Sequence, residues 1–385
     1  MMKRIIYVSN AYLSSMRANA VHIMRMCDAF AENGVDVTLY CDEKGDLEKV
    51  YDIYGVKHRF PIVSPRSRML FDKINKNIKS LFYSWKNANA IKQREKNAFV
   101  YGRSLFILFF LHNKIPFSYE VHATPTSKIL GWMERCVLRY SKLVKLVAIS
   151  NPLKDYYEKT FPNELKGKVV VLHDGADAVN QNSERKASLD NAPSRYPDVN
   201  IGYIGSLYPG KCMEVLLPIA KAMPDVMLHI VGGDKEWVKH WQEETEKLNV
   251  KNLVFYGKIS PAKVSGYYEA LDICLMPYSS KIYVNKNKKL EIGQWISPLK
   301  LFEAMAHGKA ILVTDLPSIR EVMEDGEDAL LLSATDTKSW VDAIERLAKS
   351  EELRLKLSTH ARKKLEEEYS WSIRAKRIEN SFTIR

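Results

Sequence analysis

The chain has 385 residues, of which 46% are hydrophobic and 27% are charged, with 17 glycines and 15 prolines. This composition is typical of a globular protein and excludes a fibrous or disordered one. The length favours two domains, because a single hydrophobic core seldom grows so large. Five scattered cysteines without a Cys-x-x-Cys spacing argue against a disulfide framework or a zinc site and for a reducing cytosol.

The net charge of +12 is concentrated in the first half of the chain. Residues 1–180 hold 28 Lys and Arg against 17 Asp and Glu, whereas residues 181–385 hold 30 against 29. This asymmetry indicates that the N-terminal half faces an anionic partner, such as a membrane surface, a phosphorylated acceptor or nucleic acid. A generally basic surface is the simpler alternative.

The chain begins Met-Met-Lys-Arg, followed by an apolar stretch at residues 5–8. This stretch is too short for a signal peptide and is not followed by a small-residue cleavage site, so we interpret it as a first β-strand. The longest apolar run, residues 105–111, is far below the roughly 18 residues that cross a bilayer. We therefore expect a cytoplasmic protein without a membrane-spanning segment.

Apolar strand-like runs alternate with helix-like segments along most of the chain. The first series of predicted strands comprises residues 5–9, 37–40, 98–101, 118–122, 144–150 and 169–172. The second comprises residues 201–205, 227–231, 253–256, 273–276, 310–314 and 329–332. Between the two series, residues 176–200 are polar and show no apolar period, which is typical of a linker.

This alternation predicts an α/β protein of two Rossmann-like, doubly wound domains that face each other across a cleft. We place the N-terminal domain at residues 1–178 and the C-terminal domain at residues 179–367, with a last helix, residues 368–385, packing back on the first domain. Ligands of doubly wound sheets bind beyond the carboxyl ends of the strands, so the site is expected in the loops that follow them.

In the second half, the first strand leads into a glycine-containing loop, residues 205–211, and then an apolar helix. Free amides and the positive end of the helix dipole bind phosphate at such a turn, and Lys211 would add a mobile cation. A second feature is the stretch Ser297-Pro298-Leu299-Lys300-Leu301-Phe302-Glu303. Pro298 suits the first turn of a helix, and Glu303 could accept hydrogen bonds from the two hydroxyls of a ribose.

These residues resemble the retaining GT-B glycosyltransferases, specifically family four, over essentially the whole chain. The stretches that carry the resemblance are SPLKLFEAMAHGKAILVTDLPSIREV (297–322), YIGSLYPGK (203–211), HDGAD (173–177), LDICLMPY (271–278) and YSWSIRAKRI (369–378). Each is degenerate alone, but their order and spacing are hard to obtain by chance.

The resemblance implies roles for individual residues. His122, Lys211 and Glu303 are the implied catalytic residues: His122 near the transferred sugar, Lys211 on the diphosphate and Glu303 on the ribose. The implied donor-binding residues are Gly205, Ser206, Lys211, Gly257, Lys258, Ile259, Ser297, Pro298, Leu299, Lys300 and Glu303. Arg17, Asn19 and Arg103 are candidates for acceptor or phosphate binding.

Three positions depart from the family's pattern. Trp295 stands where many relatives have a first glutamate, Ser206 where an arginine often binds phosphate, and Cys212 where glycine often follows the lysine. The N-terminal loop, residues 16–22, also lacks the usual glycines, and Arg17 or the helix start at Asn19 would supply the charge that Ser206 lacks. The identity of the donor sugar therefore stays open, whereas these departures bear much less on the expected nucleoside diphosphate.

The remaining histidines and acidic residues suggest no metal centre. His22 and His173 are interpreted as structural histidines of a helix or loop, whereas His122 is expected at the carboxyl end of a strand. No His, Cys, Asp and Glu residues have metal-ligand spacing, and no Asp-x-Asp follows a strand in the first half. We expect no metal and no cofactor beyond the nucleotide-sugar substrate.

Residues 66–96 predict an amphipathic helix with basic flanks. The basic residues are Arg66, Arg68, Lys73, Lys76, Lys79, Lys86, Lys92, Arg94 and Lys96, and the apolar ones between them are Leu70, Ile74, Ile78, Leu81, Phe82 and Trp85. Such a helix could pack on its own domain or lie on an anionic membrane leaflet, which would make the protein peripheral on the inner face of the cell membrane. Nucleic acid is the poorer interpretation, since no nucleic-acid motif is present.

Taken with the resemblance, the sequence implies a metal-independent, retaining glycosyltransferase of the hexosyltransferase type (EC 2.4). It would move a sugar from a nucleoside diphosphate donor, UDP-sugar being favoured over GDP-sugar, to an acceptor glycan, lipid-linked in bacterial cell-surface polysaccharide or lipopolysaccharide synthesis. A sugar-nucleotide epimerase of the same fold and a catalytically silent binding subunit remain alternatives. A nicotinamide dehydrogenase is disfavoured, because no Gly-x-Gly-x-x-Gly follows the first strand.

Overall fold

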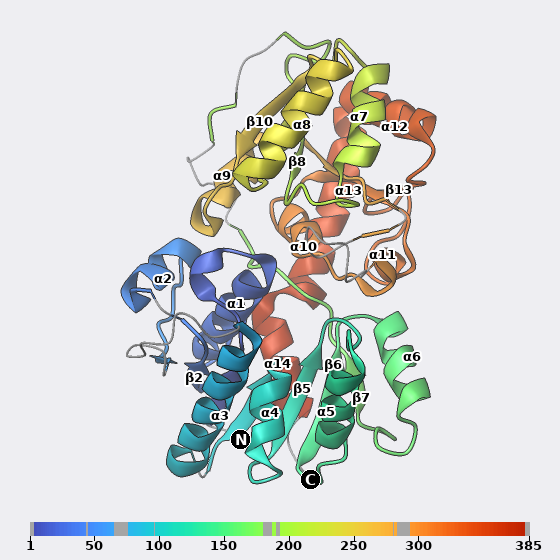
Figure 1. The fold of residues 1–385 in the computed structure, drawn as a ribbon. Helices are drawn as coiled ribbons and strands as arrows, with labels where there is room; N and C mark the ends of the chain where they lie inside the picture. Colours follow the sequence, from blue (N-terminus) through green and yellow to red (C-terminus); the bar gives the residue numbers. More distant parts are fainter. Residues whose placement is uncertain are drawn as a thin grey trace. The chain divides into compact units, whose positions relative to one another are not determined.

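The computed structural model describes residues 4–43, 45–64, 76–95, 97–179, 187–189, 193–279, 281–282 and 293–381. The chain divides into two compact units (Figure 1): unit 1 comprises Met1–Asp174 and Trp371–Arg385, and unit 2 comprises Gly175–Ser370. The domain boundaries expected from the sequence lie between residues 178 and 179 and between residues 367 and 368. Parts of the expected linker, residues 180–186 and 190–192, and of the expected basic helix, residues 66–75 and 96, lie outside the described residues.

Unit 1 is built on a parallel sheet in the order β3-β2-β1-β4-β5-β6-β7. Its strands are β1 (Arg4–Val8), β2 (Asp36–Tyr40), β3 (Ile62–Val63), β4 (Phe99–Gly102), β5 (Phe117–Val121), β6 (Leu143–Ala148) and β7 (Val169–Val171). The order reverses between β1 and β4, which is the position where doubly wound sheets bind ligands. Gly102 ends β4 with φ 145°, and a Cβ there would meet Val8 O at 2.2 Å, so only glycine allows this close approach.

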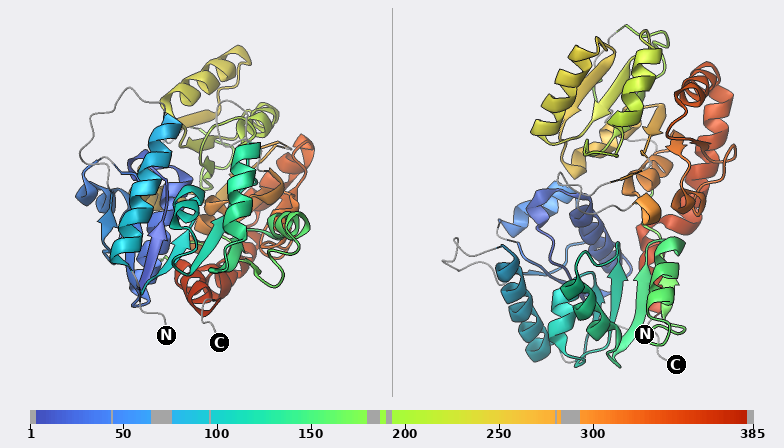
Figure 2. Two further views of the ribbon diagram at one scale, coloured as in Figure 1. Left: turned by 60° about the horizontal axis from the view of Figure 1, so that its bottom comes forward. Right: turned by 45° about the vertical axis from the view of Figure 1, so that its right-hand side comes forward.

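Helices cover both faces of this sheet (Figures 1 and 2). They are α1 (Ala18–Glu32), α2 (Leu47–Tyr54), α3 (Lys76–Arg94), α4 (Leu105–Leu111), α5 (Lys128–Leu138), α6 (Asn151–Thr160) and α14 (Trp371–Ser381), with a 3-10 turn at Leu13–Ser15. The hydroxyls of Ser104 and Ser127 cap α4 and α5 by accepting from Ile107 N and Leu130 N. Helices α3, α4 and α5 form a row, whereas α14 packs beside α1.

The last helix, α14, belongs to unit 1 although it follows unit 2 in the chain. The Asn33 side chain at the end of α1 donates to Ser372 O (3.0 Å) and accepts from Ser372 Oγ (2.7 Å). Trp371, Ala375 and Ile378 are buried. The C-terminal residues are thereby brought close to the sheet of unit 1.

Unit 2 repeats the plan with a parallel sheet in the order β10-β9-β8-β11-β12-β13. Its strands are β8 (Ile201–Ile204), β9 (Leu228–Val231), β10 (Leu253–Gly257), β11 (Ile273–Met276), β12 (Ala310–Thr314) and β13 (Leu330–Leu332). Its helices are α7 (Met213–Ala222), α8 (Lys235–Lys247), α9 (Pro261–Ala270), α10 (Leu299–Ala306), α11 (Pro317–Arg320), α12 (Thr337–Lys349) and α13 (Glu351–Lys364), with a 3-10 turn at Gly293–Trp295 and a π-helical turn at Leu365–Tyr369.

Two apolar clusters in unit 2 lie on opposite faces of its sheet. Leu312 packs into one cluster and its neighbours Ile311 and Val313 into the other, because successive strand side chains point to opposite faces. Such two-sided burial explains why these strands read as continuous apolar runs in the sequence.

The predicted fold class, two Rossmann-like α/β domains with doubly wound parallel sheets, is confirmed. All twelve predicted strands are present, with ends that differ by a few residues. The edge strand β3 was not predicted, because its two residues directly after Pro61 are too few to show an alternating pattern. Among the described residues, we find no helix with the length and apolarity that crossing a membrane requires.

Candidate functional site

The loops after β8 and β9 in unit 2 are in close backbone contact. Gly205 directly follows β8, and a Cβ on Gly232, which follows β9, would meet Gly205 O at 2.2 Å. The Ser206 carbonyl accepts a hydrogen bond from the Tyr203 hydroxyl at 2.7 Å. The predicted residues Gly205 and Ser206 therefore lie where the sheet opens toward a ligand.

Asp234 links this region to the loop that follows β10. Its carboxylate accepts from the Tyr208 hydroxyl at 2.7 Å and from Lys258 Nζ at 3.2 Å. Gly257, which ends β10 with φ 69°, lets the chain turn toward Lys258 and Ile259. Asp234 was missed by the sequence analysis, although the Val231-Gly232-Gly233-Asp234 run after a predicted strand was a usable signal.

Helix α10 begins at Leu299, directly after Pro298, so the proline precedes the first turn instead of lying in it. Ser297 and Pro298 lead into the helix, and Lys300 and Glu303 lie on its first two turns. The short run of good helix formers after a proline explains why the helix begins here.

Lys300 is an unusual buried cation in unit 2. Its Nζ lies 4.0 Å from the ring centre of Tyr203 and 4.4 Å from that of Tyr278. The atom is buried and has no hydrogen-bond partner among the described residues. Burial lowers the pKa of Lys300 to about 7, with the nearby Lys211 adding a smaller repulsion. The two aromatic faces supply a weaker interaction than an anion would.

Lys211 lies close enough to Lys300 for the two charges to interact. Burial lowers the pKa of Lys211 to about 8. Lys211 is half-buried and the Lys300 ammonium is buried, and among the described residues no carboxylate is bonded to either. The two form an electropositive position, which an anionic ligand would stabilise.

Glu303 lies on α10 beside α9. The Tyr268 hydroxyl donates to Glu303 Oε2 at 3.1 Å, and also lies 3.3 Å from Lys300 O. The His307 ring stacks on the Tyr268 ring with centroids 4.9 Å apart. Burial and the Glu303 charge raise the pKa of Tyr268 well above its ordinary value, so this tyrosine stays a hydrogen-bond donor that orients the carboxylate.

In unit 1, His122 directly follows β5 and its side chain is 18% exposed. Its Nε2 lies 2.5 Å from Glu120 Oε1. Burial and the charge of Arg103 lower the pKa of His122 to about 4. Arg103 follows β4, and its backbone N donates to Val8 O at 3.1 Å. The structure therefore brings His122 and Arg103 to one edge of the sheet.

Arg17 and Asn19 lie at the start of α1, where both are exposed. Within the described part of the chain, no hydrogen bond or ion pair joins either side chain to His122. The structure thus does not gather all of the predicted unit 1 residues at one point.

A buried group of charged side chains that the sequence analysis did not assemble surrounds His122. Glu120 Oε2 accepts from Arg374 Nη2 of α14 at 3.0 Å and from the Tyr101 hydroxyl. His22 Nδ1 lies 2.9 Å from Asp174 Oδ1, and its Nε2 lies 2.8 Å from Glu120 Oε1 without hydrogen-bond geometry. His22, which the sequence led us to interpret as a structural histidine, thus lies beside His122, the candidate catalytic histidine. No motif in the sequence pointed to this contact.

The three side chains His22, His122 and Asp174 could in principle hold a metal ion, since their potential ligand atoms lie within 4.8 Å of one another. Sequence spacing did not indicate this group, because its members come from α1, from the residue after β5 and from the end of the first segment of unit 1. Each is already paired, and Arg374 brings a positive charge to Glu120 at the same place. We do not assign these residues as metal ligands.

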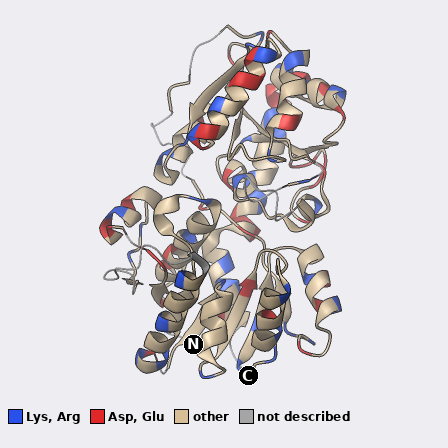
Figure 3. Ribbon diagram, viewed as in Figure 1, with Lys and Arg blue, Asp and Glu red and all other residues tan. Residues whose placement is uncertain are grey.

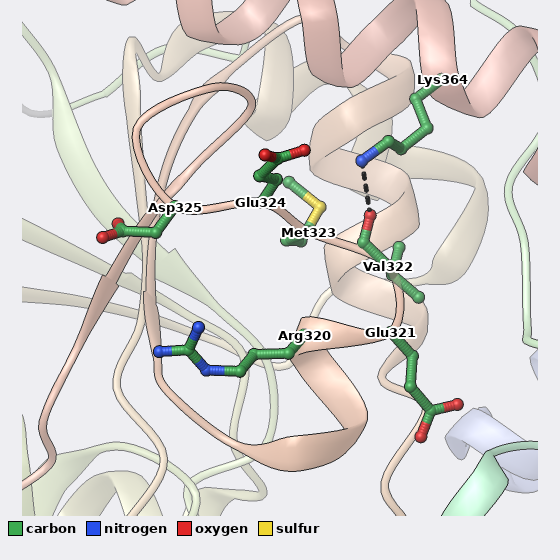
Figure 4. A pocket seen from close by; sticks show the side chains of 7 residues that line it. All are labelled: Arg320, Glu321, Val322, Met323, Glu324, Asp325 and Lys364. Carbon is green, nitrogen blue, oxygen red and sulfur yellow. Dashed lines mark hydrogen bonds between the residues drawn. The ribbon is translucent and has the colours of Figure 1, made fainter.

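A separate pocket of about 270 Å³ lies in unit 2 between α11 and α13 (Figure 4). It is lined by Arg320, Glu321, Val322, Met323, Glu324, Asp325 and Lys364, and the Lys364 ammonium donates to Val322 O at 3.0 Å. None of the predicted site residues lines it.

Part of this chain is similar to a known protein family. Residues 198–350 match the family model described as "Glycosyl transferases group 1". A phosphatidyl-myo-inositol mannosyltransferase of Mycobacterium leprae is 29% identical over 215 residues, which cover 53% of this chain and 53% of the relative. The chain thus spans about half the length of the curated relatives it matches.

Solved glycosyltransferase structures match over the whole chain. Anabaena HepE, solved with UDP and glucose, superposes with a TM-score of 0.72 at 13% identity and covers 100% of both chains. A mutant of S. aureus TarM, solved with UDP and alpha-GlcNAc-glycerol among its ligands, has a TM-score of 0.72 at 11% identity, again with 100% coverage of both. At such identities the likeness shows the fold alone, and that fold is GT-B.

Proposed function

We propose that this protein is a glycosyltransferase that uses a nucleoside diphosphate sugar, because residues 198–350 match the model of the glycosyl transferases group 1 family and the chain has the GT-B fold. Unit 2 binds the donor and unit 1 contributes the acceptor site. The observation that carries the proposal is the buried Lys300 ammonium, which lies beside Lys211 and on the same helix as Glu303, and which lacks a hydrogen-bonded partner among the described residues.

A diphosphate completes this arrangement chemically. Its negative charge neutralises Lys211 and Lys300, while amides of the loop that begins at Gly205 and Ser206 donate to its oxygens. Glu303, held by Tyr268, accepts from the two ribose hydroxyls. The base lies against the Gly257–Ile259 loop, which the Lys258–Asp234 ion pair orders.

The same groups assist the reaction. Breaking the bond between the anomeric carbon and the diphosphate oxygen builds negative charge on the leaving group, and two preorganised ammonium groups stabilise that charge. This supply of positive charge from side chains supports a mechanism without metal. His122 contacts the transferred sugar, and the acceptor hydroxyl attacks the same face, with retention of configuration.

The names and ligands of similar proteins support a more specific choice of donor and acceptor. HepE and TarM were solved with UDP, which supports a UDP-sugar over a GDP-sugar. The M. leprae relative is named for a phosphatidylinositol acceptor, which supports a lipid-linked glycan acceptor in cell-surface polysaccharide or lipopolysaccharide synthesis. In this proposal Arg17, Asn19 and Arg103 bind the acceptor or its phosphate.

A lipid-linked acceptor requires access to a membrane, and α3 offers a surface for it. Ile78, Phe82 and Trp85 lie one turn apart and are 58%, 39% and 46% exposed. Lys79 and Lys86 lie on the same helix, with Lys86 Nζ 4.9 Å from the Phe82 ring centre. Basic positions recur along the ribbon of α3 (Figure 3). Exposed aromatic rings between lysines suit the interface of an anionic leaflet, and we propose peripheral binding there.

Incubation with UDP- and GDP-sugars, with and without a lipid-linked glycan, tests the function. Transfer to the acceptor, or slow hydrolysis without it, agrees with the proposal. Release of an isomerised sugar would indicate the epimerase instead, and binding without turnover would indicate a silent subunit. A matched Lys300→Met variant should lose turnover, since it keeps the volume of the side chain and removes its charge.

A further inference from the structure

The centre of unit 1 holds a carboxylate to which four side chains point. Glu120 is 1% exposed, and its two oxygens contact His122 Nε2 at 2.5 Å, His22 Nε2 at 2.8 Å and Arg374 Nη2 at 3.0 Å. The Tyr101 hydroxyl also donates to it. A buried carboxylate with this many partners is held in one orientation, because any rotation would break several contacts at once.

Glu120 has buried partners other than His122. Arg374, which is 3% exposed, forms an ion pair with it and neutralises one of the two buried carboxylates. His22 lies between Glu120 and Asp174, with one ring nitrogen toward each.

These partners keep Glu120 ionised although it is buried. Burial alone would raise its pKa, but Arg374, His22 and the hydrogen bond from His122 bring the pKa well below the ordinary value. The pKa of Asp174 is lowered in the same way, against burial, by His22. Glu120 therefore faces His122 as an acceptor without a proton of its own.

An ionised acceptor decides where the single proton of a neutral histidine lies. His122 Nε2 is 2.5 Å from Glu120 Oε1, and an unprotonated nitrogen at that distance would place two lone pairs against each other. The proton must then be on Nε2. The other ring nitrogen, Nδ1, keeps its lone pair.

We propose that Glu120 is a positioning residue that fixes His122 as the Nε2-protonated tautomer, so that Nδ1 is the ring atom offered to a substrate hydroxyl. Arg374 and His22 support this by holding Glu120 in place and ionised, which makes the C-terminal helix α14 part of the site. The contact between His122 and substrate rests on the proposed glycosyltransferase function, whereas the tautomer does not. Arg103, the remaining charged group that faces His122, opposes a second proton on its ring.

The tautomer can be measured on the unmodified full-length protein. Nitrogen-15 labelled histidine, observed by long-range proton–nitrogen NMR at pH 7, distinguishes protonated from unprotonated ring nitrogens, and a His122→Gln variant assigns the signal. The inference expects a protonated Nε2 and an unprotonated Nδ1. A protonated Nδ1, or an imidazolium, would overturn it. So would stoichiometric zinc binding that shifts the His22 and His122 signals, since their nitrogens would then be ligands.

Kinetics test whether this positioning matters. Glu120→Gln should lower kcat by about 10- to 100-fold, the range usual for groups that orient a functional histidine, with the donor KM near that of the wild type. Glu120→Asp, which keeps the charge, should recover part of the loss. An unchanged kcat in Glu120→Gln would contradict the role.

A matched control separates positioning from folding. Glu134→Gln removes another buried carboxylate of unit 1, one that accepts from Tyr119 and Tyr157 instead of a histidine. It should change neither the His122 tautomer nor kcat. If the protein transfers no sugar and yet shows the expected tautomer, the proposed function fails and the inference on His122 stands.

Discussion

The hydroxyl of Tyr268 lies 3.1 Å from Glu303 Oε2 and joins α9 to α10 at the candidate donor site. The carboxylate is thereby oriented before any nucleotide binds. An oriented acceptor loses little freedom on binding two ribose hydroxyls, which is the condition for a strong contribution to affinity.

Glu303→Ala should weaken binding of the donor nucleotide by about tenfold or more, because hydrogen bonds to a charged group contribute about 1.5–3 kcal/mol. Tyr268→Phe, which keeps the carboxylate and removes its orientation, should cost less. Fluorescence or calorimetric titration with UDP measures both. Glu243→Ala, an exposed glutamate of α8, is the control and should bind normally. Equal affinity in Glu303→Ala and wild type would remove the ribose assignment.

Lys211 and Lys300 predict a pH dependence of donor binding. The pKa values of about 7 for Lys300 and about 8 for Lys211 are low because burial disfavours the charged form. A bound diphosphate favours that form and raises both pKa values, so binding takes up protons between pH 7 and 9. Affinity should fall as the pH rises through this window, by at most about tenfold per unit and per lysine.

Calorimetry in two buffers of different protonation enthalpy measures this proton uptake. Lys300→Met should reduce it, whereas Lys263→Met, which removes an exposed lysine of α9, should leave it unchanged. Affinity that is constant from pH 7 to 9, without proton uptake, is incompatible with a diphosphate bound at these lysines.

Peripheral membrane binding predicts a sedimentation result. Replacing Lys79 and Lys86 by Gln should weaken binding to anionic vesicles by about tenfold or more, since each basic residue near the surface contributes about 1 kcal/mol. Phe82→Ser with Trp85→Ser should also weaken it. Leu355→Ser, which changes a 57% exposed apolar residue of unit 2, is the control. Binding that none of these changes affects would leave α3 as an ordinary surface helix.

Glu134 predicts a pH-dependent stability of unit 1. Burial raises its pKa to about 7, so between pH 4.5 and 7 the folded protein holds a proton that the unfolded chain lacks. The contribution of this proton to the free energy of unfolding is fully present below the pKa of the unfolded chain and is lost as the pH rises through 7. The loss is on the order of 3 kcal/mol. Glu134→Gln should therefore gain apparent Tm relative to wild type between pH 5 and 8. A constant difference across that range would show that Glu134 is ionised throughout.

The proposed metal-free mechanism predicts that dialysis against EDTA leaves sugar transfer unchanged. The positive charge at the leaving group comes from Lys211 and Lys300, so no cation is needed there. Activity that EDTA abolishes and one metal restores would contradict the mechanism, and the group formed by His22, His122 and Asp174 would become the first place to search for that metal.

The sequence allowed the fold to be predicted because both sheets are buried on two faces. Strands such as β11 and β12 are buried at every residue and therefore appear in the sequence as short apolar runs. The edge strand β3 was missed, since two residues after a proline carry no periodic signal. The helix start at Pro298 was placed within one residue.

The site was predicted less completely, for a physical reason. Glu303 and Lys300 lie in one local motif, whereas the side chains that contact them, Tyr268 and Tyr278, come from other elements. Glu120, His22 and Arg374 are brought together only by the sheet order and by α14, over separations of up to 254 residues. Residue spacing along the chain cannot reveal a contact that topology creates.

Isothermal titration calorimetry of this chain with UDP and GDP tests whether a nucleoside diphosphate binds at Lys300 and Glu303. We expect saturable binding of at least one of these diphosphates, with weaker binding of the corresponding monophosphate and with loss of binding in the Lys300→Met and Glu303→Ala variants. No heat with either diphosphate, or equal binding by both variants, would contradict it.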